Sequence, residues 1–185
     1  MAAEIMSVSR YALVERERRF LVSELPRHKP SATRSITDLY IEGTRIRLRR
    51  SHAVVDGPPE TVRKLTQKLP APNGVVGHCG AVTTMYLDEA EYGALSGLPG
   101  HWLSKQRLSF PPMGVDVFEG PLMGLMIAEA EFHDDETMAA FVPPPWCGHE
   151  VTEHPSLTGA SLARMAGMPA SDAAAALTAV LTSIG

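Results

Sequence analysis

From Val14 to Val22 the chain reads Val-Glu-Arg-Glu-Arg-Arg-Phe-Leu-Val, with its charges in two interleaved rows. Successive side chains of a β-strand point to opposite faces, so Glu15, Glu17 and Arg19 would project together from one face. Two carboxylates and a guanidinium make a poor hydrophobic core, but they can hold a divalent cation beside an anion. The segment therefore predicts a strand that carries a charged binding site.

The same alternation recurs further along the chain. Within residues 44–50, Arg45, Arg47 and Arg49 share one parity, and in the next run Lys64 shares a face with Lys68. Strands are predicted at residues 37–50 (a hairpin turning at Glu42-Gly43), 61–69, 81–87, 102–110, 115–118 and 125–132. Turns or breaks are predicted at 56–59 and 70–74, which are rich in Pro, Gly, Asp and Asn.

Helix signals are fewer. Asp88 followed by Glu91 has the form of a capping box, and acidic residues from Asp134 suit the start of a second helix. A short helix is expected at 161–165, and the Ala-rich tail is expected to pack as another. These elements indicate a β-rich α+β domain over residues 11–167, preceded by an N-terminal segment (1–10) and followed by the tail (168–185).

Each charged strand carries mostly one sign of charge. On an open sheet the charges would face water over an apolar core, but rows of like charge repel one another. Their recurrence on strand after strand favours a closed barrel with a polar interior and an apolar outside that helices partly cover. Basic strands would then surround a polyanion, and acidic strands would hold a divalent cation.

The bulk properties exclude several classes of protein. A chain of 185 residues is long enough for one substantial domain. Its net charge of -4 argues against a surface built to bind nucleic acid, and it has no apolar segment long enough to span a bilayer. Two cysteines, Cys79 and Cys147, are too few for a disulfide framework, so we expect reduced thiols in a cytoplasmic protein.

The opening segment resembles the Glu-x-Glu-x-Lys signature of the CYTH superfamily, the triphosphate tunnel metalloenzymes. The resemblance continues, in consistent order, through residues 45–49, 65–68, 105–107, 115–118, 127–132, 141–146 and 151–152. It spans most of the chain, from about Val14 to Ala163. It implies an eight-stranded antiparallel closed barrel that forms a tunnel.

The resemblance also implies a ligand and a chemistry. A triphosphate-containing small molecule would be bound with Mg²⁺ or Mn²⁺ and hydrolysed by water at its terminal phosphorus. Bidentate guanidinium groups suit phosphate oxygens, and carboxylates suit these hard cations. The phosphate side would consist of Arg45, Arg47, Arg49, Lys64, Lys68, Lys105 and Arg107, and the metal side of Glu15, Glu17, Asp116, Glu129 and Glu131. Arg19, Glu17 and Lys105 would act directly in the reaction, in a monomer or homodimer.

The chain departs from the family pattern at three places. Arg19 stands where the signature has lysine, Val82 and Thr84 stand where many members carry glutamates, and residues 156–159 lack a Tyr and an Asn common in relatives. The leading hypothesis is that the protein is a metal-dependent hydrolase of inorganic, nucleoside or other organic triphosphates. A polyphosphate or nucleotide binder without hydrolysis is the alternative. An adenylate cyclase of the class IV type ranks lower, because nothing in the sequence indicates an adenine pocket.

Overall fold

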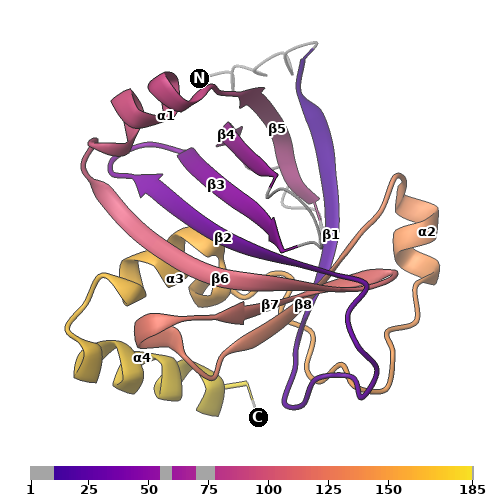
Figure 1. The fold of residues 1–185 in the computed structure, drawn as a ribbon. Coiled ribbons are helices and arrows are strands. Elements are labelled where there is room, and N and C mark those ends of the chain that lie inside the picture. Colours follow the sequence, from indigo (N-terminus) through magenta and orange to yellow (C-terminus); the bar gives the residue numbers. More distant parts are fainter. Residues whose placement is uncertain (1–10, 55–59, 70–77, 185) are drawn as a thin grey trace, which may run out of the picture.

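The structure, a computed structural model, describes residues 11–54, 60–69 and 78–184. Strands in these ranges form a closed antiparallel barrel in the order β1-β5-β4-β3-β2-β6-β7-β8 (Figure 1). The strands are β1 (Leu13–Leu21), β2 (Ala32–Ile41), β3 (Ile46–Val54), β4 (Thr61–Lys68), β5 (His78–Tyr86), β6 (Gly100–Phe110), β7 (Met113–Phe118) and β8 (Met126–Glu131). The helices are α1 (Glu89–Ser96), α2 (Asp135–Ala140), α3 (Gly159–Ala166) and α4 (Ala170–Thr182), with short 3-10 turns η1 (Gly120–Leu122) and η2 (Pro155–Leu157).

The predicted eight-stranded antiparallel barrel is confirmed. The predicted strands all occur, with ends shifted by a few residues, and the hairpin between β2 and β3 turns through Gly43, whose φ is 69°. The predictions for the N-terminal segment (1–10) and for the breaks at 56–59 and 70–74 lie outside the described residues.

Strand β1 closes the barrel by pairing on both edges. Leu13 and Val14 pair with β5, and residues 17–21 pair with β8, so that Glu17 faces Glu131 and Arg19 faces Glu129 across the strands. The register shifts between Val14 and Arg16, at the point where β1 changes partner. Because alternate residues share a face, this register places the β1 charges on the same inner surface as the β8 glutamates.

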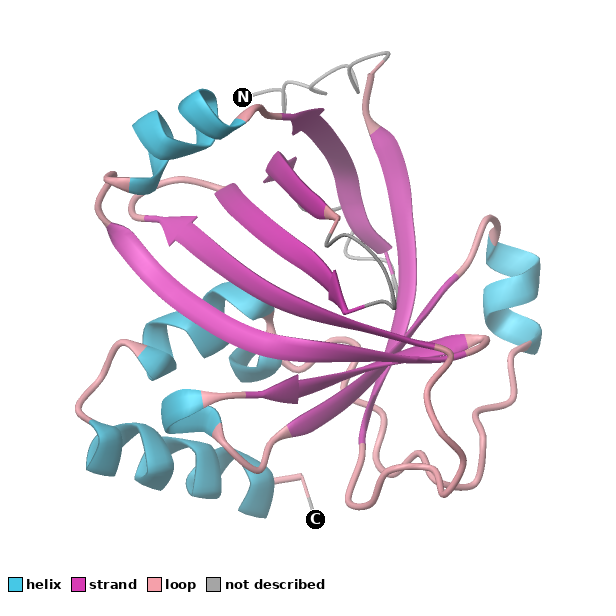
Figure 2. Ribbon diagram, viewed as in Figure 1, coloured by secondary structure: helices cyan, strands magenta, loops and turns pink. Residues whose placement is uncertain are grey.

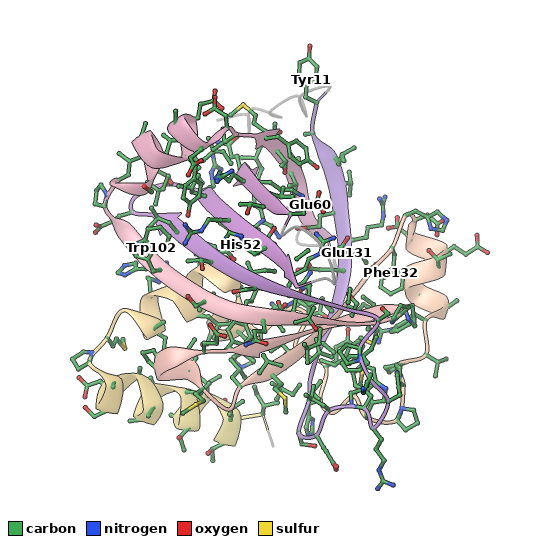
Figure 3. The ribbon with its side chains drawn as sticks, in the orientation of Figure 1. Tyr11, His52, Glu60, Trp102, Glu131 and Phe132 are labelled. Atoms are coloured by element: carbon green, nitrogen blue, oxygen red, sulfur yellow. The ribbon has the colours of Figure 1, made fainter. Side chains whose placement is uncertain are left out.

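Apolar side chains on the outer face of the barrel form two clusters. Leu39 of β2 and Leu48 of β3 are fully buried beneath Tyr92 of α1. Phe20 and Val115 belong to the second cluster. Aromatic residues of the segment after β8 pack against this cluster. Parts of the outer face stay uncovered: Trp102 on β6 is 43% exposed and points away from the barrel (Figure 3).

A third apolar cluster lies beneath α3 and α4 and includes residues from the inner face of the barrel. Leu103 of β6, Phe118 of β7 and Ile127 of β8 share strand parity with the charged inner residues, yet they pack against Leu162 of α3 and Leu177 of α4. The predicted flanking helices are confirmed, and α3 and α4 in addition bury the apolar end of the inner wall. Figure 2 shows these two helices close together on the side of β6 and β7, apart from α1 and α2.

Local signals account for where the helices start. The predicted capping box is present at α1, where Asp88 Oδ1 accepts from the Glu91 N–H (2.8 Å) and Glu91 Oε2 accepts from the Asp88 N–H (2.9 Å). Asp134 caps α2 through the Thr137 N–H (2.7 Å). In the described ranges no helix has the length and hydropathy needed to cross a bilayer.

Two glycines provide a matched test of the barrel packing. A Cβ added at Gly100 would lie 2.3 Å from the Tyr40 carbonyl oxygen and 2.9 Å from Leu39 Cδ1, whereas one added at Gly93 on α1 would meet nothing within 4 Å. Gly100→Ala should therefore destabilise the protein by about 2–3 kcal/mol, because it forces β2 and β6 apart. Gly93→Ala should stabilise it by about 0.5–1 kcal/mol, because alanine favours the helix. Urea unfolding would measure both, and equal effects would contradict the proposed packing.

Candidate functional site

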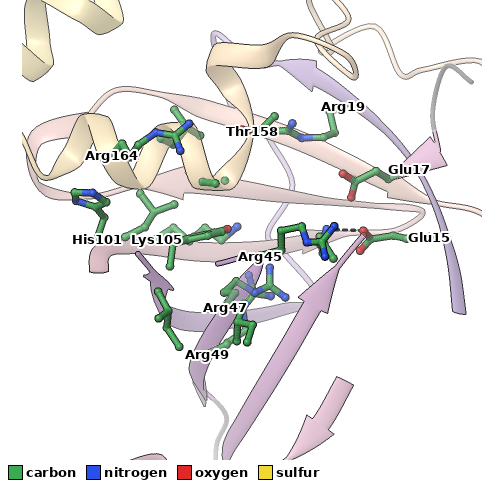
Figure 4. A pocket seen from close by; sticks show the side chains of 18 of the residues that line it. Glu15, Glu17, Arg19, Arg45, Arg47, Arg49, His101, Lys105, Thr158 and Arg164 are labelled. Atoms are coloured by element: carbon green, nitrogen blue, oxygen red, sulfur yellow. Dashed lines mark hydrogen bonds and ion pairs between the residues drawn. The ribbon is translucent and has the colours of Figure 1, made fainter. Parts of the chain in front are cut away.

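A cavity of about 800 Å³ opens along the charged inner wall of the barrel (Figure 4). Its lining comes from most of the strands and from the segment between Thr152 and Arg164. Ligand sites for small molecules typically enclose about 300–1,000 Å³. The cavity is therefore large enough for a small molecule, and the charges that surround it determine which kind.

Four of the six described glutamates that line the cavity lie on β1 and β8, and the other two, Glu42 and Glu153, lie in loops. Glu15 and Glu17 project from β1, and Glu129 and Glu131 project from β8. Basic side chains contact this group: Glu15 accepts from Lys68 Nζ, and Glu129 accepts from Arg107 Nη2. The predicted gathering of these four residues around one space is what the register of β1 and β8 produces.

The basic part of the lining lies across the cavity on β3, β4 and β6. Arg47 and Arg49 extend from β3, Lys68 from β4, and Lys105 from β6 next to Arg107. Arg45, just before β3, extends the same row toward the rim and is exposed. The Nε atom of Arg47 is buried without a hydrogen-bond partner among the described residues. A buried N–H of this kind is costly unless an acceptor satisfies it, so the wall is suited to an anion.

Two buried aspartates lie behind these basic residues. Asp38 of β2 accepts from Arg49 Nε (2.6 Å) and Nη2 (2.8 Å), and Asp116 of β7 accepts from Arg107 Nε (2.7 Å) and Nη2 (2.8 Å). Asp116 also accepts from Lys105 Nζ. Both carboxylates are fully buried and neither lines the cavity. Asp116, expected on the metal side, thus lies in contact with cationic side chains.

Electrostatics differ between the two central glutamates. Burial raises the pKa of Glu17, and the nearby Glu129 and Glu15 carboxylates add to the rise, against the opposing charges of Lys68 and Arg19. Burial also acts to raise the pKa of Glu129, but the Arg107, Lys105 and Arg19 charges outweigh it and hold that pKa below its usual value. The surroundings thus disfavour the ionised form of Glu17 and favour the ionised form of Glu129.

Burial likewise lowers the pKa of Lys105, despite the opposing effect of the Asp116 and Glu129 carboxylates. This lysine is 6% exposed and lies over the Phe118 ring, with 5.6 Å between Nζ and the ring centroid. Removal from water disfavours the charged amine. Lys105 thus sits at the boundary between the charged wall and the apolar end of the cavity.

Arg19 ties β1 to the C-terminal segment. Its Nη2 donates to the Leu157 carbonyl oxygen (2.5 Å), and its Nε lies 3.5 Å from Glu129 Oε1. The backbone is held too: the Arg19 carbonyl accepts from the Val151 N–H (2.7 Å), and the Arg19 N–H donates to Thr152 Oγ1 (3.0 Å). The guanidinium lines the cavity, but part of its hydrogen-bonding capacity is already used.

The structure does not bring every predicted residue into the lining. Lys64 lies with its Nζ 5.0 Å from the centroid of the Tyr86 ring and is outside the cavity lining. Val82 and Thr84 are also outside it, and Thr84 Oγ1 lies 3.2 Å from Thr66 Oγ1. The missing glutamates on β5 thus fall at positions that do not border this cavity. Of the two cysteines, Cys147 is a free thiol whose pKa burial raises to about 11.

Several lining or supporting residues were not predicted. Tyr40 and His101 line the cavity beside α3, and an added Cβ at Gly159 would lie only 2.0 Å from the Tyr40 hydroxyl oxygen. Arg164 of α3 also lines it. Asp38 had a usable signal: it is the lone acid within the first strand of a predicted hairpin whose second strand carries four arginines. Arg164 had none, because its position depends on how α3 packs.

The residues present fit a hard divalent cation by donor type. Four carboxylates on adjacent strands supply oxygen ligands, which Mg²⁺ and Mn²⁺ prefer. Among the described residues, no three acidic, His or Cys side chains are gathered closely enough to form a metal cluster as they stand. Two of the carboxylates instead contact Lys68 and Arg107, so a cation would compete with these side chains.

The chain is similar to inorganic triphosphatase in sequence and in fold. It is 54% identical to the inorganic triphosphatase of Nitrosomonas europaea over 39 residues, which are 21% of this chain and 26% of that enzyme. This match therefore spans about a quarter of the relative's length. No protein-family model matches the chain.

Two crystal structures extend the likeness over the barrel. The inorganic triphosphatase NE1496 superposes with a TM-score of 0.54 and 27% identity, covering 85% of this chain and 97% of that one. A second crystal structure, described as the hypothetical protein NE1496, gives the same TM-score and identity over 84% and 99%. The likeness supports a triphosphatase-like fold for this chain.

Proposed function

We propose that this protein hydrolyses a triphosphate, such as inorganic tripolyphosphate or a nucleoside triphosphate, with the help of Mg²⁺ or Mn²⁺. The observation that carries the proposal is the cavity itself, which has a row of carboxylates on β1 and β8 facing guanidinium and ammonium groups on β3, β4 and β6. The similarity to inorganic triphosphatases supports it, and so does the resemblance to the CYTH superfamily along most of the sequence.

The basic wall would bind the phosphate oxygens. Arg47, Arg49 and Arg107 present planar groups suited to bidentate contact, and Lys68 adds a point charge. Phosphoryl transfer depends mainly on positioning and on neutralising charge spread over the transferred group. Lys64 is left out of this proposal, because it lies against Tyr86 outside the lining.

The acidic row would hold the divalent cation. Glu15, Glu17, Glu129 and Glu131 are the proposed ligands, with Glu17 central because two carboxylates already crowd it. Asp116 is left out, because both of its oxygens accept from Arg107 and Lys105. A cation bound there would lower the pKa of a coordinated water and offset the charge that develops on the phosphate.

Arg19 favours a second possible function, in which the protein binds its ligand without hydrolysing it. Its guanidinium donates to the Leu157 carbonyl and cannot give up a proton, so it is poorly suited to orient an attacking water. According to this hypothesis, the basic wall would bind polyphosphate or nucleotide, and no bond would be broken.

Hydrolysis would be tested by incubating the purified protein with Mg²⁺ or Mn²⁺ and tripolyphosphate or ATP, and measuring released phosphate. Glu17→Gln should lower the rate by about 100-fold or more, as expected when a charge-stabilising group is lost from a buried site. Glu136→Gln, on exposed α2, is the matched control and should leave the rate unchanged. Tight binding without phosphate release would favour the binder, and cyclic AMP formed from ATP would favour the cyclase.

Cation binding would be measured without reference to activity, by calorimetric titration of Mn²⁺ into the protein. Glu129→Gln should abolish or strongly weaken the binding, since it removes one of the four proposed oxygen ligands. Glu136→Gln should bind Mn²⁺ as the parent protein does. An unchanged affinity in Glu129→Gln would contradict the proposed ligand set.

The raised pKa of Glu17 predicts a pH-dependent stability effect. Because its folded-state pKa lies above the usual 4.5, the protonated form favours folding and the ionised form opposes it as pH rises. Glu17→Gln should therefore raise Tm at pH 7.5, where each 1 kcal/mol corresponds to about 2–4 °C in a chain of this size. The gain should shrink toward zero at pH 4, when Glu17 is protonated in both states. A lower Tm for Glu17→Gln at pH 7.5 would contradict this explanation.

A further inference from the structure

Asp38 has no contact with the cavity and yet holds two of the side chains that line it. The carboxylate is fully buried on β2, opposite Arg49 in the β2–β3 register. Its oxygens accept from Arg49 Nε (2.6 Å) and Nη2 (2.8 Å), and Oδ1 lies 3.8 Å from Arg47 Nε. Apart from the long-range effect of its charge, Asp38 can therefore act on a ligand only through these arginines.

The geometry of the pair leaves the far end of the Arg49 guanidinium for a ligand. Arginine has five N–H groups, and the contact with Asp38 uses the edge formed by Nε and Nη2. The Nη1 end has no hydrogen bond to the residues that the structure describes. An arginine side chain has many rotamers, so a fixed carboxylate behind it removes much of the ordering that anion binding would otherwise require.

The same arrangement occurs on another pair of strands. Arg107 of β6 donates to Asp116 of β7 with the same two atoms, Nε at 2.7 Å and Nη2 at 2.8 Å. Here too the aspartate is fully buried and the arginine lines the cavity. On each of two strand pairs, a buried aspartate thus holds the Nε and Nη2 edge of an arginine that lines the cavity.

Stability alone is a weak reason for such a pair. Burying two charges costs about as much as their attraction returns, and apolar residues of similar volume often serve as well. The Asp38 charge also opposes anion binding, because it reduces the positive potential of the wall. What the carboxylate supplies is the direction of the guanidinium groups.

We propose that Asp38 is a positioning residue, which orients Arg49, and Arg47 beside it, to receive phosphate oxygens. This inference rests on the proposed function, since it takes the cavity to be a triphosphate site. Burial acts to raise the pKa of Asp38, but the Arg49 and Arg47 charges outweigh it and lower that pKa to about 2. The carboxylate is therefore ionised and able to accept both hydrogen bonds at any pH at which the enzyme would be assayed.

The test is calorimetric titration of inorganic tripolyphosphate into the full-length protein without divalent cations, so that binding is measured without turnover. Asp38→Asn should raise the dissociation constant by about 10-fold to 100-fold, by analogy with the loss of an outer-shell partner that orients a metal ligand. The number of sites per chain should stay near one. A purely electrostatic role would tighten binding instead, and a purely structural role would lower the number of sites and the Tm at an unchanged affinity.

Two further variants guard against misfolding and against indirect effects. Asp38→Glu keeps the charge on a longer side chain. A higher dissociation constant in this variant would therefore indicate displaced arginines, even if Asp38→Asn does not fold. The double variant Asp38→Asn with Arg49→Lys should have a dissociation constant little higher than that of Arg49→Lys alone, because lysine cannot form two hydrogen bonds to Asp38 as arginine does. Asp135→Asn, which makes the same change beside Arg16 on the surface, is the matched control and should bind normally.

The outcomes separate the two proposals. If the parent protein fails to bind tripolyphosphate, the proposed function is wrong. If it binds and both Asp38 variants match its affinity with full site numbers, the function stands and the positioning role of Asp38 is overturned.

Discussion

The rest of the structure depends on keeping opposite charges within contact distance inside a closed barrel. Glu17 of β1, Asp116 of β7 and Lys105 of β6 are buried, although Glu131 at the end of β8 is exposed, and a charge is costly to bury alone. Contacts such as Arg107 with both Asp116 and Glu129 make their burial tolerable. A barrel suits such contacts, because side chains from distant strands converge on one axis.

The charges are not fully balanced within the protein. Glu17 remains crowded by other carboxylates, and the buried Nε of Arg47 has no hydrogen-bond acceptor among the described residues. Both residues line the same cavity. Under the proposed function, a cation would bind near Glu17 and a phosphate near Arg47, as is common at sites where activity competes with stability.

Strand parity made much of this arrangement predictable from the sequence. It assigned Glu15, Glu17 and the β3 arginines to one interior, because a side chain's face depends only on its position along a strand. Parity does not give depth along the barrel axis. Lys64 shares the parity of Lys68 but lies outside the cavity lining, and Leu103 shares the parity of Lys105 but packs against α3. Arg164 depends on how α3 packs against the barrel, so a single sequence gives little warning of it.

The double pairing of β1 has a consequence for how the chain is made. Strand β1 cannot complete its hydrogen bonds until β5 and β8 have been synthesised, and Arg19 donates to a carbonyl as distant in sequence as Leu157. Contacts so distant in sequence slow folding, because loop closure must precede them. The acidic half of the cavity therefore cannot form before β8 has been synthesised, and until then β1 has an unpaired edge that invites association with other chains.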